Sequence, residues 1–190
     1  MLGLQLGTPG ADDLARLSDT VPTHDQVGST LTSSAPVGMG RRQVSAPLGD
    51  TQRTFDTACS ALRAWTPQRS LGATVAPDGV TPSLGAVVLL GLGIGPARLV
   101  VPNRVIAVVD EPDRYGYAYV SLPGHPACGE ELFLVERHDD GEVVLTIRTD
   151  SRPAHPLRHL GFAIRTTQYF AMRRYISATA RQVRRATASA

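Results

Sequence analysis

Lysine is absent from this chain, and all 19 basic residues among its 190 are arginine. Arginine and alanine codons are rich in guanine and cytosine, so we attribute the bias to a GC-rich, bacterial genome rather than to a need for guanidinium groups. Cysteine is scarce, and the two present, Cys59 and Cys128, are too far apart for a metal-binding spacing. Without a secretory signature, we expect both to be reduced thiols of a cytoplasmic protein.

Long apolar runs are also lacking. The longest, LGAVVLLGLGIG at residues 84–95, ends at a proline, and a run of this length is too short to cross a bilayer as a helix. The start of the chain has neither the basic region nor the long apolar core of a signal peptide. The GLGIG motif within the run is followed by a strand, whereas a dinucleotide loop requires a helix there. We therefore expect no transmembrane segment and no cofactor.

Hydrophobic residues make up 42% of the chain and charged residues 19%, which is typical of one globular domain with its own core. The charge is unevenly distributed. Residues 1–150 contain 11 arginines and 17 acids, whereas residues 151–190 contain eight arginines and no acid. Such a basic end can attract an anionic partner, but arginines also coat the solvated face of a helix. Because no aromatic or glycine pattern of nucleic-acid-binding modules accompanies the charge, no nucleic acid partner is expected.

Turn residues and periodicity divide the chain into two parts. Residues 1–38 are rich in Ser, Thr, Gly, Pro and Asp and show no sustained period, so we predict a mostly irregular N-terminal extension. Residues 39–186 are predicted to form a single domain. Within it, Asp50 is a candidate N-cap for a helix that Pro67 ends. Short apolar or alternating runs bounded by turn residues predict strands at 40–47, 86–92, 98–110, 115–122, 130–137 and 143–150.

The connections between most of these strands are short and contain no helix, which indicates an antiparallel sheet. From about residue 153 to 185 the apolar period is helical, with Ile164, Gln168, Met172 and Tyr175 on one face and most of the arginines on the other. This helix is the one predicted element large enough to cover the sheet. A curved antiparallel sheet wrapped around a long C-terminal helix encloses an interior space, so the predicted fold is α+β of the helix-grip kind.

The densest group of polar and aromatic residues is YGYAYVSLPGHPACGEELFLV, at residues 115–135. Strand alternation places Tyr115, Tyr117, Tyr119 and Ser121 on one face. That face either lines a cavity, where the rings give apolar contact and the hydroxyls orient a ligand, or forms a solvent-exposed aromatic row that stabilises the sheet. The sequence leaves both interpretations open.

His125, Glu130 and Glu131 follow in the loop and the next strand. A histidine near a carboxylate can act as a general acid or base, which makes His125 and Glu130 the candidate catalytic residues. The same residues can instead hold the loop in place by hydrogen bonds. Adjacent glutamates on a strand point to opposite faces, so we expect no metal site here.

Three further candidates lie outside this segment. Arg152, between the last strand and the helix, can pair with Glu130 or bind a carboxylate or phosphate of a ligand. Gln168 and Tyr175, on the apolar face of the helix, need hydrogen-bond partners either on the sheet or on a ligand.

Several segments together resemble a known family over about residues 24–185. They are VGST (27–30), ALRAW (61–65), RVIAVVDEPDRYGYAYVSLPGHPACGEE (104–131), SRPAHPLRHLG (151–161) and TTQYF (166–170). On these segments the chain is similar to the domain of unknown function nineteen-ninety, also called uncharacterised protein family zero-five-four-eight, but it has Val120 and Ser121 where that family usually has glycine and threonine. The family in turn resembles the START-like, helix-grip superfamily, whose members bind lipids, hormones and polyketides and include some cyclases and hydrolases.

The pattern and the resemblance together predict a domain that binds a small, largely apolar or amphipathic molecule between the sheet and the C-terminal helix. One alternative is a cyclase- or hydrolase-like enzyme with His125 and Glu130 as its acid and base. Another is a ligand-free interaction module that uses the basic helix. The oligomeric state stays open. The predicted ligand-binding residues are Tyr117, Tyr119, Ser121, His125, Glu130, Arg152, Gln168 and Tyr175.

Overall fold

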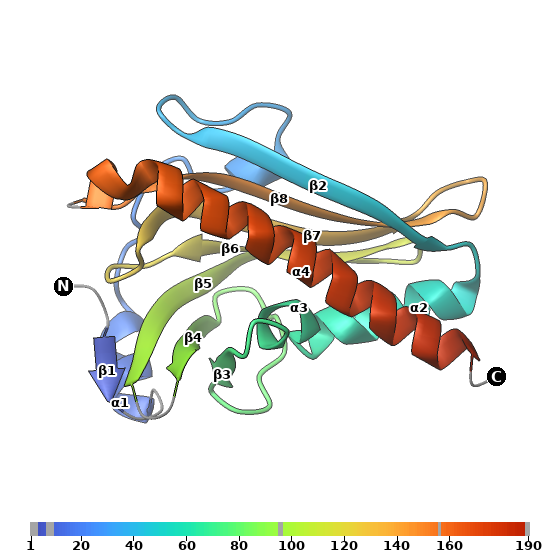
Figure 1. Ribbon diagram of the computed structural model, residues 1–190, viewed down its shortest axis with the longest axis horizontal. Coiled ribbons are helices and arrows are strands. Elements are labelled where there is room, and N and C mark those ends of the chain that lie inside the picture. The colour runs from blue at the N-terminus through green and yellow to red at the C-terminus, as the bar shows by residue number, and fades with distance from the viewer. Residues whose placement is uncertain (1–3, 7–9, 95–96, 156, 189–190) are drawn as a thin grey trace.

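One curved antiparallel sheet forms most of the molecule, and the long helix α4 (Gly161–Ala188) crosses one of its faces (Figure 1). The computed structural model describes residues 4–6, 10–94, 97–155 and 157–188. In the order in which they pair, the strands are β2 (Gly40–Gly49), β8 (Val143–Pro153), β7 (Ala127–Arg137), β6 (Arg114–Ser121), β5 (Ala97–Glu111), β4 (Val87–Ile94) and β3 (Thr74–Ala76), while β1 (Leu4–Leu6) also pairs with β5.

The antiparallel sheet and the long C-terminal helix confirm the predicted architecture. All six predicted strands are present with shifts of a few residues at their ends, and their pairings are antiparallel. Strands β1 and β3 were not predicted, because three residues are too few to establish an alternating pattern.

Two shorter helices, α2 (Gln52–Arg63) and α3 (Thr66–Arg69), contact α4. The hydroxyl of Thr51 accepts the backbone N–H of Thr54 at 3.1 Å, so Thr51 caps α2 and the prediction of Asp50 as the cap is wrong. Trp65 links the two helices in a left-handed conformation, with φ at 56°. Its indole nitrogen donates to the carbonyl oxygen of Val80 at 2.8 Å, which satisfies the polar atom of this buried ring.

Helix α4 begins later than the apolar period predicted. Strand β8 continues to Pro153, which pairs with Ala127, and the 3₁₀ turn η2 (Leu157–Leu160) precedes the helix. Residues 151–153 therefore lie in the sheet, which corrects the predicted helix start near residue 153. Among the described residues, no helix is both long and apolar enough to span a membrane.

The main core lies between the sheet and the helices α2 and α4. Trp65, Tyr117 and Phe133 are the largest fully buried side chains in it. Burying an aromatic or aliphatic side chain of this kind stabilises a fold by roughly 1.5–3 kcal/mol. A smaller cluster that includes Ala118 and Leu132 occupies the opposite face of the sheet, as the alternation of strand residues requires. Cys59 and Cys128 are both buried and free.

The described part of the first 38 residues contains three short elements: β1, the helix α1 (Ala11–Leu17) and the 3₁₀ turn η1 (Ser29–Leu31). Leu14 and Leu17 of α1 pack against a small cluster formed by β3, β4 and β5. The turn η1 contacts β7 and β8. Elements of three to seven residues leave no sustained period, which is why the sequence pattern indicated a mostly irregular segment.

Candidate functional site

The tyrosine face of β6 points toward the helices. Tyr115, Tyr117 and Tyr119 are 0–5% exposed and belong to the main core, so the alternative of a solvent-exposed aromatic row does not hold. The Tyr117 ring lies 4.8 Å from that of Trp65 and 5.3 Å from that of Phe133, measured between centroids. Its hydroxyl donates to the side-chain oxygen of Gln68 at 3.2 Å. Tyr117 is therefore a packing residue behind the cavity described next.

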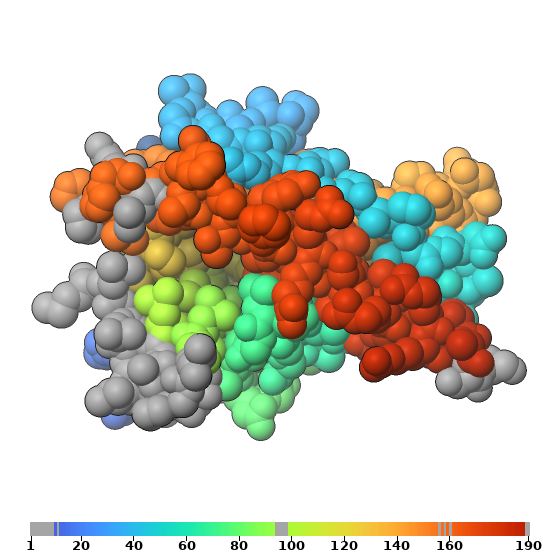
Figure 2. All heavy atoms as spheres, viewed as in Figure 1, coloured from blue at the N-terminus to red at the C-terminus, as the bar shows by residue number. Residues whose placement is uncertain are grey.

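A cavity of about 380 Å³ lies between the sheet and the first half of α4. Strands β4 to β8 line one side, and α4 lines the other with residues from Ala163 to Tyr175. Figure 2 looks toward it, between the orange start of α4 and the light-green atoms below. Its apolar lining includes Leu71, Leu90, Leu92, Leu99, Val101, Ile164 and Ala171.

Glu131 and Tyr119 form a hydrogen-bonded pair in the wall of this cavity. They face each other in the β6–β7 register, and the Tyr119 hydroxyl donates to the Glu131 carboxylate. Burial raises the pKa of Glu131 from 4.5 to about 7, although the hydrogen bond from Tyr119 acts in the opposite direction. Burial likewise raises the pKa of the Tyr119 and Tyr175 hydroxyls well above 10, with a further contribution from the Glu131 charge. Near neutral pH this carboxyl is therefore poised between its two protonation states.

His125, Ser121 and Gln168 also line the cavity, and each has a structural partner. The His125 Nδ1 accepts the backbone N–H of Ala127 at 2.9 Å, and burial lowers the pKa of His125 to about 4. The Ser121 hydroxyl bridges the backbone of Gly129, accepting from its nitrogen at 2.9 Å and donating to its oxygen at 3.1 Å. The Gln168 amide nitrogen lies 3.2 Å from the hydroxyl oxygen of Ser151 in β8. At neutral pH the His125 ring is thus uncharged, and its hydrogen bond with Ala127 holds the loop in place.

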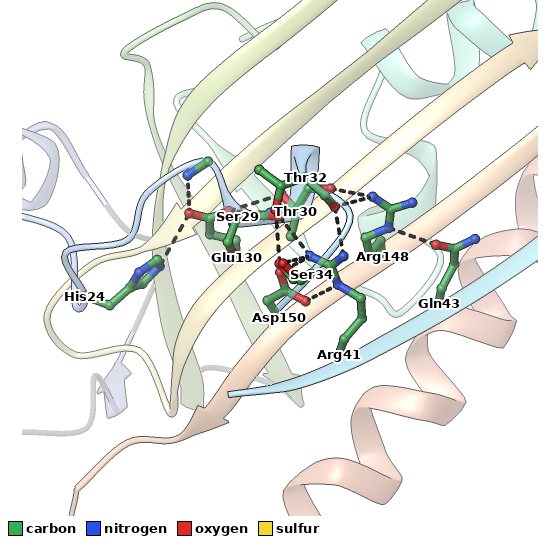
Figure 3. Close-up of polar contacts among 11 residues, drawn as sticks. His24, Ser29, Thr30, Thr32, Ser34, Arg41, Gln43, Glu130, Arg148 and Asp150 are labelled. Atoms are coloured by element: carbon green, nitrogen blue, oxygen red, sulfur yellow. Dashed lines mark hydrogen bonds and ion pairs between the residues drawn. The ribbon is translucent and has the colours of Figure 1, made fainter. Parts of the chain in front are cut away.

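Glu130 lies on the opposite face of β7 from Glu131. There its carboxylate binds the N-terminal segment (Figure 3). Its carboxylate accepts backbone N–H groups from Gly28 at 2.6 Å and Thr30 at 3.1 Å. It also accepts the hydroxyls of Ser29 and Thr30 at 3.2 and 3.1 Å. His24 Nε2 lies 3.5 Å from the same carboxylate. This placement corrects the predicted acid/base pairing of His125 with Glu130, because the carboxylate with a partner in the cavity is that of Glu131.

Arg152 is exposed, and the expected ion pair with Glu130 is not among those found in the described part of the chain. The buried ion pair beside Glu130 is instead Arg41 with Asp150, joined by two bonds of 2.6 and 2.7 Å (Figure 3). Arg41 also donates to the carbonyl oxygens of Ser29 and Thr32, both at 2.8 Å. The sequence held no signal for this pair, because Arg41 and Asp150 meet through the β2–β8 register.

Helix α4 buries Met172, Tyr175 and Val183 and exposes its arginines, as the helical period predicted. Three large apolar side chains of the same helix are also exposed: Phe162, Tyr169 and Phe170. Among the basic residues, Arg174 donates to the carbonyl oxygen of Ser70 at 2.6 Å, which joins α4 to the residue after α3. The basic helix is therefore part of the core packing as well as of the surface.

Replacing Tyr119 with phenylalanine is expected to raise the pKa of Glu131 further above 7. The lost hydroxyl is the group whose hydrogen bond favours the ionised carboxylate, while the burial that raises the pKa remains. The measurement is a pH titration of ¹³C-labelled glutamate carboxyls by NMR, with the Glu131 signal assigned from its absence in Glu131→Gln. Tyr115→Phe, which removes a hydroxyl near Arg63, serves as the control. An unchanged or lower pKa in Tyr119→Phe contradicts this assignment of the pair.

Comparison with other sequences identifies a family whose model matches most of the chain. A family model described as a domain of unknown function (DUF1990) matches residues 23–178. A protein of Deinococcus radiodurans named "UPF0548 protein" is 34% identical over 160 residues, which are 75% of this chain and 77% of the relative. An Arabidopsis thaliana protein with a UPF0548 name is 43% identical over 51 residues, which are 27% of this chain and 25% of that protein.

Comparison with solved structures shows the fold. A hypothetical protein from Helicobacter pylori superposes with a TM-score of 0.56 at 10% identity, over 75% of this chain and 86% of its own. The protein Ara h 8.0201 superposes with a TM-score of 0.53 at 14% identity, over 77% of this chain and 98% of its own. Together with the curved sheet and long helix, these matches confirm the predicted helix-grip fold.

Proposed function

The chain belongs to the DUF1990 family, as its motifs indicated, and we propose that it binds a small, largely apolar molecule in the cavity between the sheet and α4. The observation that carries the proposal is the cavity itself. Its volume of about 380 Å³ lies within the range of small-molecule sites, and leucine, valine and isoleucine side chains form much of its lining. A few polar groups at one wall, led by Glu131 and Tyr119, are the usual means of orienting such a ligand.

The affinity of such a site comes mainly from apolar area removed from water. Each Å² contributes roughly 25 cal/mol, so a molecule that buries a few hundred Å² gains several kcal/mol before the cost of association is subtracted. The hydrogen-bonded loop around His125 and Ser121 holds the polar wall in place before a ligand arrives. Preorganisation of this kind reduces the entropy lost on binding.

The first experiment is to purify the protein from its native host, denature it, and analyse the released small molecules by mass spectrometry. A stoichiometric apolar compound supports the proposal and identifies the ligand. Protein that is empty after growth under several conditions, and that also fails to bind a neutral apolar fluorophore, contradicts it.

Filling the cavity is expected to abolish binding. Ala171 lines the cavity from α4, so Ala171→Trp places an indole where the ligand would lie. We expect the affinity for the neutral fluorophore N-phenyl-1-naphthylamine to fall at least tenfold, as measured by fluorescence titration. Ser177→Trp is the matched control, because Ser177 is exposed on the same helix and does not line the cavity. Equal affinities of the two variants would show that the fluorophore binds elsewhere.

A cyclase- or hydrolase-like enzyme is a second candidate, favoured by one observation. Glu131 is a carboxyl with a pKa of about 7 beside a hydroxyl in an apolar cavity, which suits a general acid or base at neutral pH. The test is to incubate the compound released from the native protein with fresh wild type and with Glu131→Gln. A change in its mass that requires Glu131 supports catalysis, and an unchanged compound with wild type argues against it.

A further inference from the structure

The charges that face the cavity are of one sign. No arginine is among the described residues that line it, and the chain has no lysine. His125 is uncharged at neutral pH, because burial lowers its pKa to about 4. The Glu130 carboxylate is bonded to residues 28–30 on the other face of β7. Glu131 is thus an acid in the cavity wall, and among the described lining residues no cation balances its charge.

The groups around Glu131 are neutral hydrogen-bonding side chains. Tyr119 opposes it from β6, and Thr149 opposes it from β8. Across the cavity, α4 presents Gln168 and Tyr175, while the β6–β7 loop presents His125. The tyrosine hydroxyls stay protonated, because burial raises their pKa values well above 10. None of the described residues that line the cavity supplies a positive charge to balance ionised Glu131, so we take the ligand as its source.

Asn103 supplies an unsatisfied acceptor in the same cavity. Its side chain is 1% exposed and lines the cavity on β5, on the same face as Glu131. The amide nitrogen donates to the carbonyl oxygen of Val101 at 3.0 Å, which fixes the orientation of the amide, since that oxygen can only accept. The Asn103 Oδ1 is left buried without a partner. A buried acceptor without a partner is unfavourable, so a ligand group that donates to it would bind favourably.

We infer that the molecule bound in the cavity is an amphipathic amine, with a protonated, hydrogen-bond-donating head beside Glu131 and an apolar body against the leucines of β4 and β5. The inference rests on the proposed binding function and specifies its ligand class. A carboxylate or phosphate head would lie in an apolar environment beside a like charge, which is unfavourable. An ammonium head would form a charge-assisted hydrogen bond with the carboxylate. The acceptor of Asn103 is then available to a further donor on the ligand.

The test compares three ligands that differ only in their head group. Octylamine, octanol and octanoate are titrated against N-phenyl-1-naphthylamine bound to the wild-type protein at pH 8. Glu131 is then largely ionised, and the alkylamine is protonated like a lysine side chain. We expect the amine to displace the fluorophore with at least tenfold higher affinity than the alcohol, and octanoate to be the weakest. At pH 6, where Glu131 is largely protonated, the preference for the amine over the alcohol should shrink.

Glu131→Gln should remove both the preference and its pH dependence while octanol still binds. Glu142→Gln, an exposed acid in the β7–β8 connection, should leave both unchanged. Octanoate or octanol binding as tightly as octylamine to wild type overturns the inference and leaves the binding function standing. If neither the fluorophore nor any of the three ligands binds, the binding function itself fails. The wild-type comparison needs no variant, so it remains decisive even if Glu131→Gln does not fold.

Discussion

Replacing Glu130 with alanine is expected to lower the free energy of unfolding by about 3–5 kcal/mol, because several buried donors lose their acceptor at roughly 1–3 kcal/mol each. The carboxylate is fully buried and accepts four hydrogen bonds from residues 28–30. Without it, the N–H groups of Gly28 and Thr30 and the hydroxyls of Ser29 and Thr30 lose their acceptor in a site that water does not reach. His24, whose ring nitrogens have no hydrogen-bond partner, also loses the carboxylate that lies 3.5 Å from its Nε2.

Urea unfolding followed by circular dichroism measures this loss. Limited proteolysis should show in addition that residues 18–38 are cleaved faster in Glu130→Ala, because Glu130 holds this segment to β7. Glu142→Ala is the control, and its effect should stay within about 0.5 kcal/mol, as for most exposed positions. A loss below about 1 kcal/mol for Glu130→Ala, with unchanged proteolysis, would mean that the segment is held mainly by Arg41 and Asp150.

Replacing Gly129 with alanine is expected to cost more than about 3 kcal/mol or to prevent the protein from accumulating in folded form. A Cβ at position 129 would lie 2.1 Å from the carbonyl oxygen of Asp150 and 2.7 Å from the Cα of Ser151. Both are backbone atoms of β8 and cannot move aside without breaking the pairing of β7 with β8. The backbone φ of 154° adds strain, because residues with a side chain rarely adopt it.

The matched control is Gly79→Ala. Gly79 also has a positive φ, of 71°, but a Cβ there would have no atom within 4 Å. This variant should cost only about 1–2 kcal/mol, from backbone strain alone. Thermal and urea unfolding of the two variants therefore separate the steric clash from the strain. If the two variants lose similar amounts of unfolding free energy, β8 can shift away from β7. The close approach of β8 to Gly129 would then not constrain the loop beside the cavity.

Several features of this protein are determined locally, and the sequence was sufficient to predict them. Alternation along residues 115–122 and 130–137 predicted strands, and the helical period that includes Met172 and Tyr175 predicted α4. Adjacent positions on a strand must face opposite ways, so the separation of Glu130 from Glu131 was predicted as well. These patterns depend on backbone geometry over a few residues, which the sequence records directly.

The identity of the glutamate in the cavity was decided by tertiary structure. Strand alternation predicts that the side chains of Glu130 and Glu131 point to opposite faces of the sheet, but it does not predict which face α4 covers. The contacts of residues 28–30 with Glu130 and of Arg41 with Asp150 join segments about a hundred residues apart. The late start of α4 has the same origin, because Pro153 stays in the sheet through its pairing with Ala127. Periodicity is a local property of the sequence. The face of the sheet that α4 covers and the register of the strands follow instead from packing between distant segments. That packing places Glu131 in the cavity.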